Sequence, residues 1–297
     1  ILAPIMSTKG STTSPDIGLV DTNPTTVGPA TIKFTTAQAL LQAVRQSSSD
    51  VTYVEDVSTE DFANIEEAKG ETSAPRLKNF SPAQRLLILV VPTLLYERSH
   101  SKLYGLIMGE VAAMGLEDDW GDYGSTTLRA EHGGGVSEAD SSGGPMERDD
   151  DIHPWPTLVI ETGYSQSITA LRQQMRWWFT ASQHQVKIVL LIKLDPSVPG
   201  KIIIDQWKEF PREERAGATT TRSFARLEPI NTHHITIQKT LPSTNPEDPS
   251  SYGVTRGPLQ LSFMDLFLRA PGQGEGDIVL SDHHLQRLGA SVGNIRQ

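Results

Sequence analysis

The pattern of hydrophobic and polar positions predicts that the ordered core begins near residue 80. Ser81-Pro82 is a helix-start signal, with proline at the first helical position. An apolar run, Leu86–Val91, follows it. After Pro92, apolar residues recur at spacings of three and four up to Gly115, which is the pattern of a helix with one buried face. We therefore predict that helical structure starts at Ser81 and, interrupted at Pro92, ends at Gly115.

The second half of the chain reads as strands around one amphipathic helix. Thr157–Ile160 is a short apolar strand that Gly163 ends, and Ser165 or Ser167 can cap the helix that follows. The buried stripe of this helix consists of Ile168, Leu171, Met175 and Trp178. Further strands are expected at Val186–Leu194, Lys201–Trp207 and His234–Gln238. This order predicts an α/β fold with a mixed central β-sheet flanked by helices.

The flanking segments complete the predicted organisation. We expect a disordered tail over residues 1–30, a partly helical extension over 31–79 with a short helix at Ala37–Val44, the main domain over 80–290 and a tail over 291–297. Within the domain we expect an acidic, Gly-rich loop over 130–156. Smaller expected elements are a strand at Thr126–Arg129, a helix at Met264–Leu268 after Leu259–Phe263, and a terminal helix at Ser281–Leu288.

Composition narrows the compartment and the chemistry. The 297 residues contain no cysteine, which excludes disulfides, thiolate zinc sites and cysteine nucleophiles. No apolar run is long enough to cross a bilayer, and no secretion signal is visible. We therefore expect an intracellular protein, cytoplasmic or nuclear, that is neither secreted nor bound to a membrane.

The net charge of −10 would argue against nucleic-acid binding, but it is concentrated in one stretch. Between Glu110 and Asp151 there are roughly a dozen acids and two basic residues, Arg129 and Arg148. The ordinary interpretation of such a run is a solvated loop. The alternative is a carboxylate-rich site that binds a cation.

Glu161 is the most unusual residue of the predicted core, because it stands at the end of an apolar strand and before a helix. Ligands of α/β sheets bind at the carboxyl ends of strands. A solvated glutamate, or one paired with an arginine, would explain the same pattern.

Mg²⁺ takes oxygen ligands, usually one or two carboxylates with water and phosphate. The preceding loop offers four aspartates as the second ligand, Asp140, Asp149, Asp150 and Asp151. Spacing does not choose among them.

From Leu86 to about Gly289 the chain resembles a group of fungal proteins related to the PD-(D/E)xK nuclease superfamily. The segments that carry this resemblance are Val91–Glu97, Glu138–Ser142, Pro156–Ser165, Leu171–Trp178, Val186–Leu194, Ile204–Trp207, Leu259–Arg269 and Asp277-Ile278. The resemblance implies a restriction-endonuclease-like core. It also implies that Asp140 and Glu161 are Mg²⁺ ligands and that Glu97 is a helical glutamate beside the metal.

The sequence departs from the family pattern at the presumed catalytic lysine. Gly163, not lysine, stands two residues after Glu161, so the lysine must come from elsewhere. Arg172, Lys187 and Lys193 are the cationic candidates, with Lys193 preferred. Further along the chain, Gln174 stands where related chains carry an aspartate. Two other replacements are Tyr96 for a histidine and Ala139 for a proline.

Three functions follow as hypotheses. The first is a Mg²⁺-dependent nuclease acting on DNA or RNA through Asp140 and Glu161, with Glu97, Gln174 and Lys193 as further site residues. The second is a catalytically degenerate relative that serves as a binding module for a basic protein. A purely structural protein is the third. The oligomeric state does not follow from the sequence.

Overall fold

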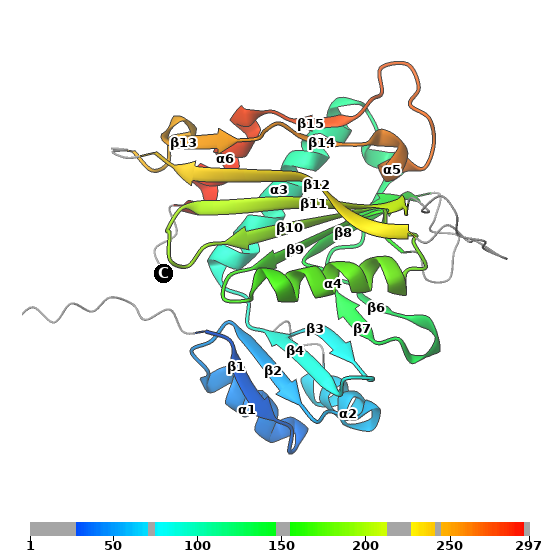
Figure 1. The fold of residues 1–297 in the computed structure, drawn as a ribbon, viewed down its shortest axis with the longest axis vertical. Coiled ribbons are helices and arrows are strands. Elements are labelled where there is room, and N and C mark those ends of the chain that lie inside the picture. Colours follow the sequence, from blue (N-terminus) through cyan, green and yellow to red (C-terminus); the bar gives the residue numbers. More distant parts are fainter. Residues whose placement is uncertain (1–27, 71–74, 147–154, 213–226, 241–244, 294–297) are drawn as a thin grey trace, which may run out of the picture.

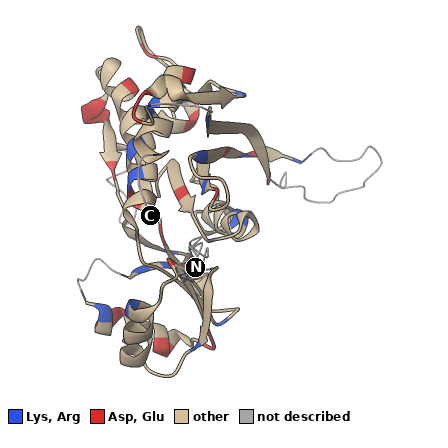
Figure 2. Ribbon diagram, turned by 90° about the vertical axis from the view of Figure 1, so that its left-hand side faces the viewer, with Lys and Arg blue, Asp and Glu red and all other residues tan. Residues whose placement is uncertain are grey.

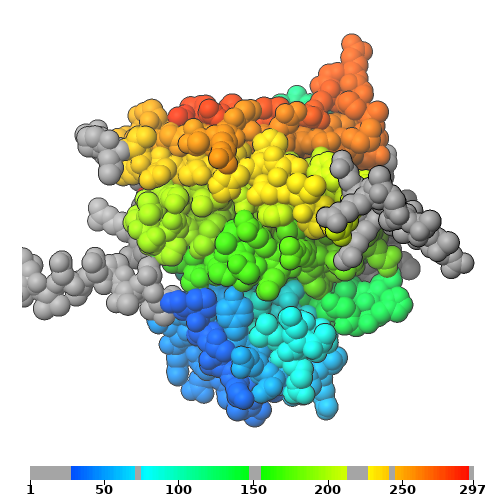
Figure 3. Space-filling view, viewed as in Figure 1, coloured from blue at the N-terminus to red at the C-terminus, as the bar shows by residue number. Residues whose placement is uncertain are grey.

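The computed structural model describes residues 28–70, 75–146, 155–212, 227–240 and 245–293. These residues form two mixed β-sheets, a two-stranded sheet and six α-helices, with the smaller mixed sheet at the bottom of Figure 1 and the larger sheet above it. In the space-filling view the segment from residue 28 to about residue 90 forms the lower part of the molecule, below the residues of the larger sheet (Figure 3). The predicted α/β class, a sheet flanked by helices, is confirmed.

The smaller sheet carries its two helices on one face. In spatial order its strands are β1 (Ala30–Lys33), β2 (Val51–Glu55), β4 (Leu86–Val90), β3 (Arg76–Ser81), β7 (Val136–Glu138) and β6 (Thr127–Arg129). Helices α1 (Ala37–Gln46) and α2 (Thr59–Lys69) pack on it through a core that includes Leu40, Ile65 and Leu87. Thr36 caps α1, and Ser58 with Asp61 forms a capping box that starts α2.

The larger sheet has helices on both faces. Its strands, in spatial order, are β13 (Tyr252–Thr255), β12 (Leu227–Lys239), β11 (Lys201–Pro211), β10 (Ile188–Leu194), β9 (Leu158–Gly163), β8 (Ser141–Pro145) and β5 (Trp120–Asp122). Strands β9 and β10 are parallel, and α4 (Ile168–Ala181) is the crossover helix between them. Helix α4 covers the face toward the viewer, and α3 (Leu94–Ala113) runs behind (Figure 1).

The remaining elements close the back of the larger sheet. They are α5 (Phe263–Phe267), α6 (Asp282–Gly293) and the two-stranded sheet of β14 (Leu259–Leu261) and β15 (Ile278–Leu280). Among the described residues, short 3₁₀ turns lie at Glu117–Asp119, Glu131–Gly133 and Pro249–Ser251. The largest apolar cluster joins α3, α5 and α6 to alternate residues of β9 to β12, such as Ile160 and Ile204. Because side chains alternate along a strand, the other residues of the same strands point to the opposite face of the sheet, which α4 covers.

Most predicted elements are present within a few residues of their expected bounds. The helix before Gly115, the strand before Gly163, the capped helix after it and the strands expected at Val186–Leu194 and Lys201–Trp207 are all confirmed. Of the two candidate caps, Ser167 is the one that accepts from the backbone, at Ala170 N. The expected tails at 1–30 and 291–297 lie largely outside the described residues.

Two expectations were wrong. Ser81-Pro82 does not start a helix, because β3 ends at Ser81 and turns into β4, with Arg85 at φ +50° in the turn. Serine and proline favour turns as well as helix starts, and the apolar run after them is long enough to pair as a strand. The loop expected over 130–156 is wrong for 136–138 and 141–145, where β7 and β8 run and every residue is buried, whereas residues 131–134 are exposed.

Candidate functional site

Three charged side chains from three distant segments of the chain meet where the two sheets join. Lys78 comes from β3 of the smaller sheet, and Glu161 from β9 of the larger one. Asp140 lies between β7 and β8, where the chain passes from one sheet to the other. Lys78 Nζ contacts Asp140 Oδ1 and Glu161 Oε2, and all three side chains are 0% exposed. The two carboxylates therefore converge on one buried cation, the ammonium of Lys78.

A β-bulge aims Lys78 at this point. In the pairing of β3 with β4, Leu77 lies opposite Leu89 and Asn79 opposite Ile88, so Lys78 is the extra residue. A bulge shifts the alternation of side chains along a strand. Leu77 and Phe80 can then both point into the core under α1 and α2, three residues apart. Lys78 turns to the opposite face of the smaller sheet, toward the larger sheet.

Hydrogen bonds fix both carboxylates. Asp140 Oδ2 accepts a hydrogen bond from the backbone N of Thr162 at 2.6 Å. Thr162 lies on β9 just beyond Ile160, the last residue of β9 that pairs with β8. Its Oδ1 accepts from the hydroxyl of Tyr96, in the first turn of α3, at 2.6 Å. Glu161 Oε1 accepts from Trp178 Nε1 on α4 at 2.5 Å. A side chain from a helix therefore holds each carboxylate, Tyr96 of α3 for Asp140 and Trp178 of α4 for Glu161.

The two acids differ in their electrostatics. Burial raises the pKa of Glu161 to about 7, although Lys78 works in the opposite direction. Burial acts in the same sense on Asp140, but Lys78 and His100 outweigh it and hold the pKa of Asp140 below its ordinary value. For Lys78, burial would lower the pKa, and the two carboxylates raise it overall. Near neutral pH the cluster thus contains an ionised Asp140, a charged Lys78 and a Glu161 that is partly protonated.

A second layer of charged groups lies between Asp140 and solvent. Arg76 Nη1 is 3.7 Å from Asp140 Oδ1, and Arg76 Nη2 is 2.7 Å from Glu97 Oε1. The other oxygen of Glu97 lies 3.2 Å from His100 Nε2, and His100 Nδ1 is hydrogen-bonded to Ser141 Oγ at 2.9 Å. The hydrogen bond from His100, followed by the charge of Arg76, lowers the pKa of Glu97. Glu97 is therefore connected to the carboxylate pair through Arg76.

The other residues expected at the site lie around it. Gln174 on α4 is buried and accepts from Gln166 Nε2 at 3.1 Å. Lys193, the preferred cation, instead contacts the backbone oxygens of Tyr164 and Leu194. Arg172 lies 3.8 Å from Asp205, and Lys187 donates to the backbone oxygen of His184 at 2.7 Å. None of these contacts involves Asp140 or Glu161. Three of the four candidate aspartates, Asp149, Asp150 and Asp151, lie outside the described residues.

Sequence reasoning missed Lys78, Trp178 and the part played by Tyr96. Lys78 stands in the segment that was assigned to an extension, before the expected domain. Its one signal is the pair of polar residues Lys78 and Asn79 between the apolar residues Leu77 and Phe80, a pattern that the alternation of an ordinary strand does not produce. Trp178 was assigned to the core stripe, where its ring does lie, but its indole N–H is the donor to Glu161.

The donor set suits a hard divalent cation only in part. Two buried carboxylates that share one positive charge are the protein ligands that Mg²⁺ commonly uses, with water and substrate supplying the rest. Across the described residues no group of three His, Asp or Glu side chains could hold a metal. The ammonium of Lys78 also lies where the two carboxylates meet. The position between the two acids is therefore taken by Lys78, and a Mg²⁺ ion bound there would have to replace its ammonium and draw its other ligands from water and phosphate.

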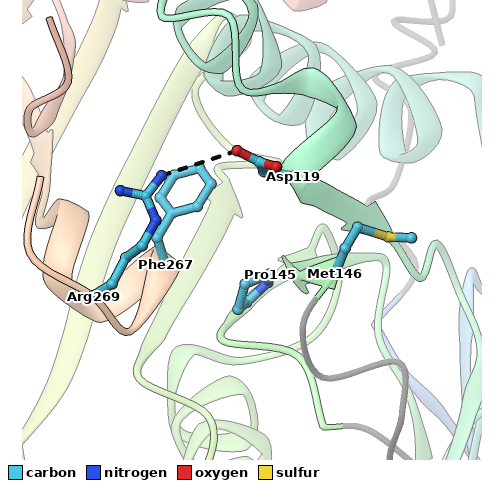
Figure 4. Close-up of a pocket in the computed structure, with 5 residues that line it drawn as sticks. All are labelled: Asp119, Pro145, Met146, Phe267 and Arg269. Atoms are coloured by element: carbon cyan, nitrogen blue, oxygen red, sulfur yellow. Dashed lines mark ion pairs between the residues drawn. The ribbon is translucent and has the colours of Figure 1, made fainter. Parts of the chain in front are cut away.

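The surface pockets are separate from this cluster. One cavity of about 70 Å³ lies between the β8 end and α5, lined by Asp119, Pro145, Met146, Phe267 and Arg269 (Figure 4). Another, of about 260 Å³, lies beside Trp177 and Gln183. Neither is lined by Lys78, Asp140 or Glu161, so the closed cluster and the open surface pockets are different features of the fold.

Comparisons with known proteins leave the chain without an assigned family. No family model matches it, and no curated protein is significantly similar to it. Among the helices of the described ranges, none is long and apolar enough to cross a membrane.

Proposed function

We propose that this domain is a Mg²⁺-dependent phosphodiester hydrolase acting on nucleic acid, with a core of the restriction-endonuclease type. One observation carries the proposal: Asp140, Glu161 and a lysine meet at a single point, although the lysine is absent from the usual position after Glu161. Two acids and a lysine are the side chains that the PD-(D/E)xK resemblance implies. In this proposal Lys78, arriving from β3, supplies that lysine.

Each residue would have a distinct part in the reaction. Asp140 and Glu161 would hold the ion, which polarises the scissile phosphate and lowers the pKa of the attacking water. Lys78, beside both acids, would stabilise the negative charge that develops on the phosphate oxygens. Tyr96 and Trp178 would hold the acids in place by their hydrogen bonds. Because burial disfavours the charged form of Glu161, ion binding would also require this group to release its proton.

A cleavage assay with Mg²⁺ tests the proposal. Single-stranded DNA, double-stranded DNA and RNA would be incubated with the wild-type protein and with Asp140→Asn, Glu161→Gln and Lys78→Met. We expect Mg²⁺-dependent cleavage by the wild type, lowered by roughly a hundredfold or more in each variant. Asp205→Asn is the matched control, because Asp205 is a buried acid of the same sheet outside the cluster. Cleavage that survives Asp140→Asn, or no cleavage of any substrate, would contradict the proposal.

The complete burial of Lys78, Asp140 and Glu161 favours a second candidate, a binding module without catalysis. In that case Lys78 is a permanent partner of the two acids and the acidic surface binds a basic protein. Acidic and basic residues both occur on the parts built on the larger and the smaller sheet, as Figure 2 shows. The module predicts salt-sensitive binding of polylysine and no cleavage, whereas the hydrolase predicts cleavage that depends on Asp140.

A further inference from the structure

Arg76 is the connection between the buried carboxylates and the surface. Among the side chains described above as contacting Asp140 or Glu161, those of Lys78, Tyr96 and Trp178 are almost completely buried. The side chain of Arg76 is 17% exposed, and its partner Glu97 is 37% exposed. A substrate phosphate that approaches Asp140 from solvent on this side therefore meets the Arg76–Glu97 pair first.

The guanidinium of Arg76 has hydrogen-bonding capacity left over. Its Nη1 is buried, lies 3.7 Å from Asp140 Oδ1 and makes no hydrogen bond to any described residue. Glu97 Oε1 is also a buried atom without a well-aligned hydrogen bond, although Arg76 Nη2 is only 2.7 Å away. Unused donors of a buried arginine are costly, so the position favours an additional anionic acceptor.

A phosphate fits this acceptor position by its chemistry. Guanidinium groups bind carboxylates and phosphates in the same forked geometry, so one can replace the other. Resting on the proposed function, we propose that Arg76 binds a phosphate of the nucleic-acid substrate next to Asp140, and that Glu97 occupies Arg76 until the phosphate displaces it. Glu97 Oε1 lies beside Arg76 and Glu97 Oε2 lies beside His100. Glu97 therefore acts in this site by holding Arg76 in place.

Binding without cleavage tests this inference directly. The fluorescence anisotropy of a short fluorescein-labelled single-stranded DNA would be measured in EDTA, which prevents metal-dependent cleavage. We expect Arg76→Met to weaken binding by roughly tenfold, the loss of one charge-assisted contact. Glu97→Gln should strengthen binding several-fold, because the competing carboxylate charge is gone. Arg76→Lys, which keeps the charge but loses the fork, should lie between Arg76→Met and the wild type.

The structure offers a matched pair of control variants. Arg129 on β6 forms an ion pair with Glu66 on α2, 2.5 Å apart, away from the cluster. Arg129→Met and Glu66→Gln change the same charges as the test variants and should leave the affinity within about twofold of wild type, as expected of an exposed pair. An oligonucleotide with an uncharged methylphosphonate backbone should bind the Arg76 and Glu97 variants alike.

The outcomes separate this inference from the proposed hydrolysis. Equal affinities of wild type, Arg76→Met, Arg76→Lys and Glu97→Gln would overturn the phosphate site, even if Mg²⁺-dependent cleavage is observed. Affinities that change as expected, without cleavage in Mg²⁺, would support the phosphate site and overturn the hydrolase. Thermal denaturation of each variant would be recorded first, and the folded variants alone would be compared.

Discussion

Glu161 and Asp205 occupy equivalent positions in the larger sheet and have different environments. Leu191 on β10 pairs with Glu161 on one side and with Asp205 on the other, so both acids point toward the face that carries α4. Both are almost completely buried. The partners of Glu161 are the buried groups of Lys78 and Trp178. The partners of Asp205 are His234 at 2.6 Å and Arg172 at 3.8 Å, whose side chains are 42% and 45% exposed.

The difference between the two acids lies in where their counter-charges are. Water can reach His234 and Arg172, so solvent screens the charge of Asp205 and can replace a lost partner. Lys78 is enclosed between the two sheets, where no water replaces it. A glutamate in this setting is costly unless a positive charge remains beside it. The same position in the sheet therefore carries a partly exposed ion pair on β11 and a closed charge cluster on β9, at the junction of the sheets.

Removing the counter-charge should give the largest contrast between the two acids. Lys78→Met leaves Asp140 and Glu161 buried without their cation, so we expect a loss of about 3–5 kcal/mol in the free energy of unfolding. Arg172→Met, the same kind of change beside Asp205, should cost about 1 kcal/mol or less. Urea denaturation of both variants measures the difference. Comparable losses would mean that the cluster is not closed to water.

The pH dependence of stability should distinguish the two acids next. The folded pKa of Glu161, about 7, lies above its ordinary value of 4.5. A raised pKa means that the folded state holds a proton that the unfolded state has released. The stabilisation is therefore fully present below pH 4.5 and is lost as the pH rises to about 7. The free energy of unfolding should decline over this window, by something on the order of 3 kcal/mol.

Glu161→Gln should remove this decline, because the amide stays neutral at every pH. Asp205→Asn leaves Glu161 in place, so the decline should persist in that variant. Urea denaturation from below pH 4.5 to above pH 7 supplies the measurement. A wild-type profile that is flat over the window would show that Glu161 is ionised throughout.

The sequence predicted the acids of the cluster better than its cation. Glu161 follows from a local pattern, an apolar strand that ends at a glycine, and the structure has this strand with its glutamate. Asp140 was one of four candidates by spacing, and the family resemblance selected it. The place of Lys78 in the cluster depends on a bulge in β3 and on its contact with Asp140, more than sixty positions further along the chain. Neither leaves a regular period in the sequence, so no local pattern indicates that Lys78 pairs with these acids.

The smaller sheet shows that local sequence patterns also fail to predict contacts between distant segments of the fold. Its strands come from residues 30–90 and again from 127–138, so the expected boundary at residue 80 falls inside β3. Local periodicity identified α1, α3, α4 and the hairpin of β10 and β11, which are built from neighbouring residues. The pairing of β3 with β7 joins distant segments, and their short apolar runs carry no information about partners. Long-range pairing is therefore the part that sequence periodicity could not supply.

The smallest expected effect concerns the tryptophans beside each acid. Trp178 Nε1 donates to Glu161, whereas Trp207 lies near Arg172 and its Nε1 has no hydrogen-bond partner among the described residues. Replacing either by phenylalanine also removes ring volume, so a double-mutant cycle with Glu161→Gln is needed to isolate the hydrogen bond. We expect a coupling energy of about 1 kcal/mol between Trp178→Phe and Glu161→Gln. The cycle with Trp207→Phe should give none, and equal couplings would show that Glu161 senses ring packing rather than the indole donor.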